Sequence, residues 1–237
     1  MRASLAIIVA SIVASGCVHG AAQAQNAQSA SGPRVTVEKG NIFIQSGSQR
    51  RQLTKLGRDE DPALSPDGAF VVFTRTDGKP PPDDSPMDCK TGPAGDQLRR
   101  INADGSGDQL LLAARAGDEP PKQLCRFEQK QFTSDGRRLF FLSPGWTTSG
   151  ALHVYDFGKK AVSFVAPANT LVVLNFCKGE HRDRLVISQH RYFLGGGAYD
   201  WHWMFDRDGK KEIGAVGDDS ETRESIVEKV RDIICAP

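Results

Sequence analysis

Two phrases of the same form recur along this chain and constrain its fold more than any other feature. They read DPALSPDGAFVVF (residues 61–73) and FTSDGRRLFFL (residues 132–142). Each combines a short strand pattern, a turn that contains Ser, Asp and Gly, and a second strand pattern rich in apolar residues. A hairpin that recurs within one chain predicts a repeat architecture rather than a single irregular sheet.

The turn residues of these phrases have physical roles. Pro66 presets the φ angle at the second position of a type I turn, and the Asp67 carboxylate accepts hydrogen bonds from the nearby backbone. Gly68 tolerates the positive φ that closes the hairpin. Asp135 and Gly136 supply the last two elements in the second phrase. We assign all five to structural turns, because a calcium site needs about six to eight oxygen ligands.

A second kind of turn recurs along the chain. Its glycines, at positions 47, 105, 158 and 209, are separated by 58, 53 and 51 residues. Asp104 and Gly105 form one of these turns, and Asp208 and Gly209 form another. Strand patterns flank each turn, at 41–44 and 52–54, 97–101 and 109–113, 151–155 and 161–165, and 201–205 and 212–216. Further hairpins lie between them, including a less clear one around 178–183. Together, an inner and an outer hairpin make a four-stranded antiparallel unit, the blade of a β-propeller.

The chain resembles a known repeat family at this point. The segment RQLT (residues 51–54), followed by DPALSPDG (61–68) and VVF (71–73), is similar to the WD40-like PD40 repeat. That repeat occurs in TolB-type periplasmic proteins and in the propeller domains of prolyl-oligopeptidase-like enzymes. NADGSG (102–107) resembles the outer hairpin of the family, whereas KGEH (178–181) departs from it. The resemblance implies an exported propeller that binds proteins or small ligands, without catalysis of its own.

These patterns predict an all-β fold. We expect a small β-propeller, or an open propeller-like array of about four four-stranded antiparallel blades, over residues 34–217. The first unit shows only three strand patterns. A short C-terminal helix and tail follow over 218–237, because Ile226, Val227, Val230, Ile233 and Ile234 form an apolar helical stripe. Asp218, Asp219 or Ser220 is expected to cap this helix, which would cover an edge of the array.

The N-terminus predicts export. Residues 1–24 have the pattern of a signal peptide, with a positive charge, a short apolar run and an A-x-A cleavage site at 22–24. Residues 25–33 follow as a disordered tether. Alternatively, ASGC (residues 14–17) resembles a lipoprotein signal, in which case Cys17 is lipidated and attaches the protein to a membrane. We therefore expect a periplasmic or secreted protein, membrane-anchored only if Cys17 is modified.

Four cysteines remain after Cys17, and in an exported chain they predict two disulfides with three possible pairings. We favour Cys89 with Cys125 and Cys177 with Cys235, which would pin two long loops and tie the terminal helix to the last unit. No C-x-x-C spacing occurs.

Charge and motif content limit the functional classes. The chain has 30 Lys and Arg against 29 Asp and Glu, so broad attraction to nucleic acid is not expected. Its histidines lack metal-ligand spacing, and we expect no metal and no cofactor. The common hydrolase and nucleotide-binding motifs do not occur, and no residue is assigned a catalytic role.

Long connections at 76–96, 115–124, 144–150 and 194–198 are expected to gather on the face opposite the tight turns, where binding residues concentrate. Our candidates there are Trp146, Tyr199 and His190, which approaches His202 across a hairpin. The alternating aromatics at 199, 201, 203 and 205 indicate packing between blades, or alternatively a ligand platform.

The sequence therefore predicts an exported, non-catalytic binding protein whose partner is another envelope protein. A sensor of small molecules or glycans, using Trp146 and Tyr199, is one alternative. A small hydrolase or lyase with a central-channel site is another, although we interpret the inner strands predicted at 62–65, 128–132 and 171–175 as mostly apolar.

Overall fold

The computed structural model describes residues 32–76, 96–115 and 117–235. These residues form one three-stranded and three four-stranded antiparallel sheets, each built from consecutive strands. Sheet 1 contains β1 (Arg34–Glu38), β2 (Asn41–Ser46) and β3 (Gln49–Gln52). Sheet 2 contains β4 (Asp59–Leu64), β5 (Phe70–Arg75), β6 (Gln97–Asn102) and β7 (Gln109–Ala113). Sheet 3 contains β8 (Glu128–Phe132), β9 (Arg138–Trp146), β10 (Ser149–Asp156) and β11 (Ala161–Pro167). Sheet 4 contains β12 (Thr170–Val173), β13 (Leu185–Tyr192), β14 (Ala198–Phe205) and β15 (Glu212–Gly217).

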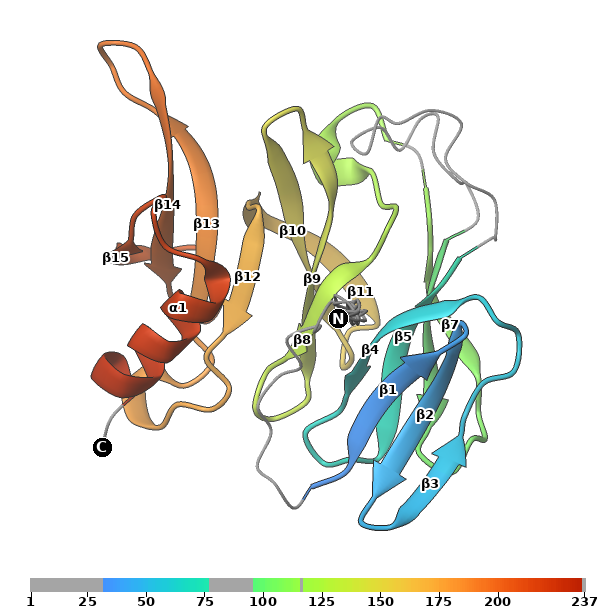
Figure 1. Ribbon diagram of the computed structural model, residues 1–237. Coiled ribbons are helices and arrows are strands. Elements are labelled where there is room, and N and C mark those ends of the chain that lie inside the picture. The colour runs from blue at the N-terminus through green and yellow to red at the C-terminus, as the bar shows by residue number, and fades with distance from the viewer. Residues whose placement is uncertain (1–31, 77–95, 116, 236–237) are drawn as a thin grey trace, which may run out of the picture.

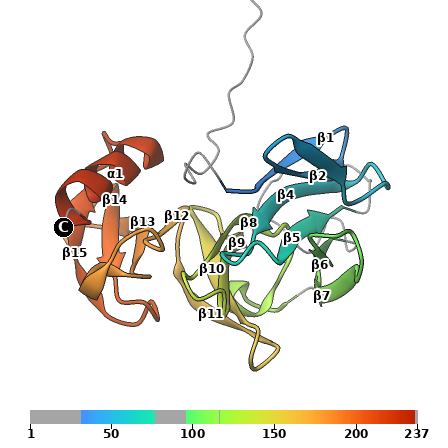
Figure 2. The same cartoon turned by 90° about the horizontal axis from the view of Figure 1, so that it is seen from below.

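The four sheets stand side by side like blades, with β4, β8 and β12 innermost (Figure 1). An apolar cluster fills each junction: Ile42, Val71 and Phe73 between sheets 1 and 2, Val72, Leu98 and Phe141 between sheets 2 and 3, and Leu152, Leu171 and Ile187 between sheets 3 and 4. Seen along the other axis, the array is open between sheet 4 and sheet 1 (Figure 2). The fold prediction is therefore confirmed in its open form.

Sheet 1 has only three described strands because it starts at a later strand of the repeat. The ring of Pro33 lies 3.4 Å from where a Cβ on Gly68 would be, and Pro66 has the same relation to Gly136 at 3.5 Å. Pro33 and Pro66 therefore occupy equivalent turns, so β1 is equivalent to β5. No described strand of sheet 1 corresponds to β4, as the three strand patterns of that unit predicted.

Short 3-10 helices at Pro120–Lys122 and Gly179–His181 interrupt two connections. The second lies in the less clear hairpin around 178–183, which does form, since β12 and β13 pair from Thr170↔Ser188 to Val173↔Leu185. Asp183, at φ 62°, accepts hydrogen bonds from the backbone N–H and the hydroxyl of Ser134, at 2.6 and 2.8 Å. A carboxylate on sheet 4 thus holds the tight turn of sheet 3.

The predicted structural turns form, with one change of role. Asp67, Asp104 and Asp135 each accept a backbone N–H two residues ahead, at 2.8 to 3.0 Å. In the last turn the equivalent acceptor is Asp206, while Asp208 pairs with Arg138 of sheet 3 at 2.5 Å. The glycines at 68, 105, 136 and 209 all have φ between 69° and 88°, as these turns require.

The C-terminal helix differs from its prediction in three details. It comprises α1 (Arg223–Lys229) and a π-helical turn (Val230–Ile234), and Thr222 is its cap, accepting from the Ser225 N–H at 3.2 Å. Asp218 instead bonds Ser220 within its own turn. The helix packs on the outer face of sheet 4 rather than on an edge, with Ile226 and Val230 fully buried against β12, β13 and β14.

Side chains from β8 hold the innermost strands together. Gln131 accepts a hydrogen bond from the Val173 N–H at 2.9 Å and donates one to the Leu171 carbonyl at 2.7 Å. Its side-chain amide therefore makes the two bonds to β12 that the backbone of a neighbouring strand would make. Gln129 accepts from the Leu171 N–H at 3.0 Å in the same way. Buried backbone groups need such partners, because leaving them unpaired is costly.

Cys177 and Cys235 form the predicted disulfide, with their Cα atoms 4.9 Å apart. Cys125 is also disulfide-bonded, and Cys89, its predicted partner, lies outside the described residues. The predicted signal peptide, most of the tether and Cys17 lie outside them too. Within the described part of the chain, no helix is long and apolar enough to cross a membrane.

Candidate functional site

The hairpin of β13 and β14 extends beyond the rest of its sheet. The two strands pair from Leu185↔Phe205 to Tyr192↔Ala198. Pairing with β12 stops at Ser188, and pairing with β15 stops at His202. Residues 189–201 therefore form a two-stranded projection, the aromatic arm, whose tip stands clear of the other strands (Figure 1). Isolated hairpins are marginally stable, so this arm needs side-chain contacts of its own.

One side of the arm carries a ladder of aromatic rings. Tyr199 and Trp201 have ring centroids 5.2 Å apart, Trp201 and Trp203 are 6.1 Å apart, and Phe193 lies 4.6 Å from Tyr199. The Arg191 guanidinium lies 3.8 Å from the Trp203 ring centroid, a cation–π contact. Trp203 packs against the core between sheets 3 and 4, whereas Trp201 is 36% exposed. The predicted packing between blades thus holds at the base of the ladder only.

The other side of the arm is more polar than the ladder side, and the tip of the arm is more exposed than either. His190 contacts the Asp200 carboxylate at 3.1 Å, and the Tyr192 ring lies 5.0 Å from the imidazole. At the tip, Tyr192 is 69% exposed, Phe193 54% and Leu194 fully exposed. Contiguous exposed apolar side chains are typical of interaction sites. Tyr199 and His190, both predicted binding residues, belong to this arm.

Trp146, the third candidate, lies in a different cluster. It is partly buried at the end of β9, where its ring meets Phe164 edge-on at 6.0 Å, and Phe164 meets His153 at 5.8 Å. His153 is fully buried on the side of sheet 3 that faces sheet 2. Burial lowers the pKa of His153 from 6.5 to about 4, so the imidazole is neutral at physiological pH. The structure therefore does not join Trp146 to the arm.

A charged cluster lies where the inner strands β4 and β8 meet. The Lys130 ammonium is completely buried and donates to Asp61 at 2.7 Å, to Thr74 at 2.8 Å and to the Phe127 carbonyl. Burial lowers the pKa of Lys130, and partial desolvation raises the pKa of the nearby Glu128 carboxyl, although the residue remains exposed at the surface.

This cluster corrects the prediction that the inner strands are mostly apolar. Strand β4 begins at Asp59 rather than at Pro62, which adds Asp59, Glu60 and Asp61 to its length. Strand β8 points Lys130 inward through an irregularity in its pairing with β9. For β8 the prediction was wrong on the sequence itself, since Glu128–Phe132 reads EQKQF, with four polar residues among five. The bulge that turns Lys130 inward is not visible in an alternating pattern. Because Lys130 of sheet 3 bonds Asp61 and Thr74 of sheet 2, the cluster ties these two sheets together.

Among the residues described, no group of three or more His, Cys, Asp or Glu side chains is placed to hold a metal ion. Comparison with known proteins gives no family assignment: no family model matches the chain, and no curated protein matches it.

Solved structures with similar folds are distant in sequence. The chain is similar to the tricorn protease at 12% identity, covering 78% of this chain and 16% of that one, with a TM-score of 0.49. It is similar to the β-propeller domain of the trilobed protease from Pyrococcus furiosus at 13% identity, covering 73% and 47%, with a TM-score of 0.47. A putative TolB from Agrobacterium tumefaciens matches at 11% identity over 78% and 77%, with a TM-score of 0.36. The chain thus spans less than half of the first two.

Proposed function

We propose that this chain is an exported, non-catalytic β-propeller protein that binds another protein of the cell envelope, with the aromatic arm as its main anchor. The observation that carries the proposal is the exposed apolar tip at Tyr192, Phe193 and Leu194. A free tip of this kind costs solubility, and burying it against a partner removes apolar surface from water. Aromatic residues are also favoured anchors at protein interfaces.

The arm is suited to presenting this tip in one orientation. The aromatic ladder stiffens one side, and Arg191 fixes its base by stacking on Trp203 and pairing with Glu212 at 2.5 Å. A preorganised binding element loses less conformational entropy on association than a flexible loop does. Export is supported by the Cys177–Cys235 disulfide, since structural disulfides are typical of oxidising compartments.

Site-specific photo-crosslinking in the native cell tests the proposal. A photoreactive residue at Leu194 should give one discrete protein adduct, and the same residue at Leu110 should not. Leu110 is a matched control because it is 49% exposed on the outer strand β7, near the tight-turn end of sheet 2. The Leu194 adduct should disappear when Tyr192→Ser is added. Equal adducts from both positions, or none from either, would contradict the proposal.

A sensor of glycans or other small ligands is a second candidate, supported by the ladder of Tyr199, Trp201 and Trp203. Sugar rings and planar molecules stack on such rings. A ligand panel monitored by tryptophan fluorescence separates the two candidates. Saturable quenching that Trp201→Leu abolishes would favour the sensor, whereas protein binding predicts no response to the panel.

A further inference from the structure

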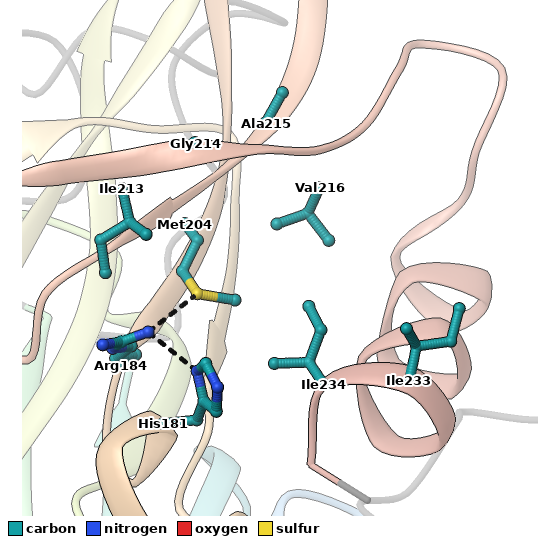
Figure 3. Close-up of a pocket in the computed structure, with 9 residues that line it drawn as sticks. All are labelled: His181, Arg184, Met204, Ile213, Gly214, Ala215, Val216, Ile233 and Ile234. Atoms are coloured by element: carbon teal, nitrogen blue, oxygen red, sulfur yellow. Dashed lines mark hydrogen bonds between the residues drawn. The ribbon is translucent and has the colours of Figure 1, made fainter.

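An apolar hollow lies on the outer face of sheet 4, between β14, β15 and the terminal helix. Figure 3 shows side chains from the sheet and from the π-helical turn around one space. The hollow has a volume of about 360 Å³. This volume falls within the range of small-molecule sites. Its walls are mainly aliphatic, and its lining residues are His181, Arg184, Met204, Ile213, Gly214, Ala215, Val216, Ile233 and Ile234.

One end of the hollow is positively charged. The Arg184 guanidinium donates to His181 Nδ1 at 2.8 Å and contacts the Met204 sulfur at 3.9 Å (Figure 3). A guanidinium can only donate, so His181 Nδ1 accepts this bond, and Nε2 faces the Glu180 carboxylate at 3.3 Å. The carboxylate of Glu180 lies 3.5 Å from Arg184 and its side chain is 74% exposed, so this ion pair is weak. An anion that enters the hollow can replace it on the guanidinium.

The rim of the hollow exposes apolar surface that the fold itself does not cover. Ile213 is 44% exposed and Ile233 is 72% exposed. The π-helical turn places Ile233 outside the buried stripe, because a π turn rotates its residues relative to an α-helix. The Cys177–Cys235 disulfide fixes that turn to sheet 4, so this wall of the hollow is held in place without a ligand.

The contacts at the edge of β15 favour a small ligand over an added strand. Lys229 donates to the Val216 carbonyl at 3.3 Å and pairs with Glu221. The ammonium therefore occupies the edge position that an incoming strand would use. We propose that this hollow binds an anionic amphiphile, with its carboxylate on Arg184 and its alkyl chain along Ile213, Val216 and Ile234. This site is separate from the arm, so it goes beyond the proposed function.

Titration calorimetry with decanoate, below its micelle concentration, tests the site on the intact oxidised protein. We expect saturable one-site binding, and at least tenfold weaker binding by Arg184→Gln, because a charge-assisted hydrogen bond is lost. Arg137→Gln is the matched control, since Arg137 is an exposed arginine in the tight turn of sheet 3, away from the hollow, and it should bind like the wild type. Decylamine, which has the same chain and the opposite charge, should bind at least tenfold more weakly.

A second variant keeps the test independent of folding. Ile213→Ser changes a side chain that is 44% exposed, so it should leave the melting temperature unchanged while weakening decanoate several-fold. Equal affinities for decanoate and decylamine, equal affinities of Arg184→Gln and Arg137→Gln, or no saturable binding would each overturn the proposal. None of these results bears on crosslinking from Leu194.

Discussion

Gln131→Leu tests whether side-chain amides hold sheet 4 in the array. Gln131 is 8% exposed, and its partners Leu171 and Val173 are almost fully buried. The variant keeps the size of the side chain and removes both hydrogen bonds. An orphaned, buried Val173 N–H costs about 1–3 kcal/mol. The Leu171 carbonyl keeps a bond from Arg223 at 3.1 Å, so its loss is about 1 kcal/mol. We expect the free energy of unfolding to fall by about 2–4 kcal/mol.

Urea denaturation with the disulfides intact measures this change as a lower midpoint at unchanged slope. Gln45→Leu is the matched control, because Gln45 is exposed and bonds only a nearby turn carbonyl, and it should change stability by less than about 0.5 kcal/mol. Amide hydrogen exchange should accelerate at Val173 in the Gln131 variant. If the two variants are equally stable, or if Val173 stays protected, the amide bonds do not hold β12 and the reasoning fails.

Three further predictions follow from single contacts. Because the pKa of His153 falls from 6.5 to about 4 on folding, the unfolded chain binds its proton first, and stability should drop by about 3 kcal/mol as pH falls through this range. His153→Phe should reduce that drop in denaturation curves compared at pH 7 and pH 4, and equal drops would contradict the assignment. Cys235→Ser should lower stability by about 4 kcal/mol, because the disulfide to Cys177 closes a loop with a separation of 58 residues; an unchanged melting temperature would refute this. Asp206→Ala should cost about 1–2 kcal/mol in urea denaturation through lost turn hydrogen bonds, whereas Asp208→Ala, which breaks a surface ion pair, should cost under 0.5, and the reverse order would show that the roles are misassigned.

Local hydrogen bonding explains which parts of the fold could be predicted. The tight turns depend on residues within a few positions of one another, so Asp67, Gly68 and their repeats were identified correctly. The last turn shows the limit of this reasoning. Asp206 and Asp208 both precede Gly209, so either could accept the turn hydrogen bonds. The ion pair with Arg138 of sheet 3 engages Asp208 instead, and Asp206 accepts them. The prediction of the helix cap was wrong for a similar reason. Several adjacent polar residues could cap the helix, and the way the helix docks on sheet 4 leaves Thr222 in that position.

The candidate sites depended more on distant contacts. Aromatic alternation along 199–205 indicated a strand face, but the length of β12 and β15 decides which rings are buried. Trp146 and Tyr199 were both predicted on the long-loop face, and the structure places them on different sheets, at β9 and β14. The sequence placed Glu128 and Lys130 on a predicted inner strand, but it did not show that Lys130 meets Asp61 and Thr74 of sheet 2. The hollow beside Arg184 had no sequence signal, because residues from several elements create it.

The sequence by itself therefore determined the repeat, the turns and the antiparallel hairpins. These follow from periodicity and from residues whose backbone preferences act locally. The sequence left three cysteine pairings open, and the structure shows the favoured bond between Cys177 and Cys235. Only the tertiary structure decided that the array stays open, that the terminal helix covers the outer face of sheet 4, and that residues 189–201 project as an arm. Those outcomes depend on how many residues of each strand pair with an adjacent strand. Pairing between segments that are distant in the sequence is not encoded in any single local pattern.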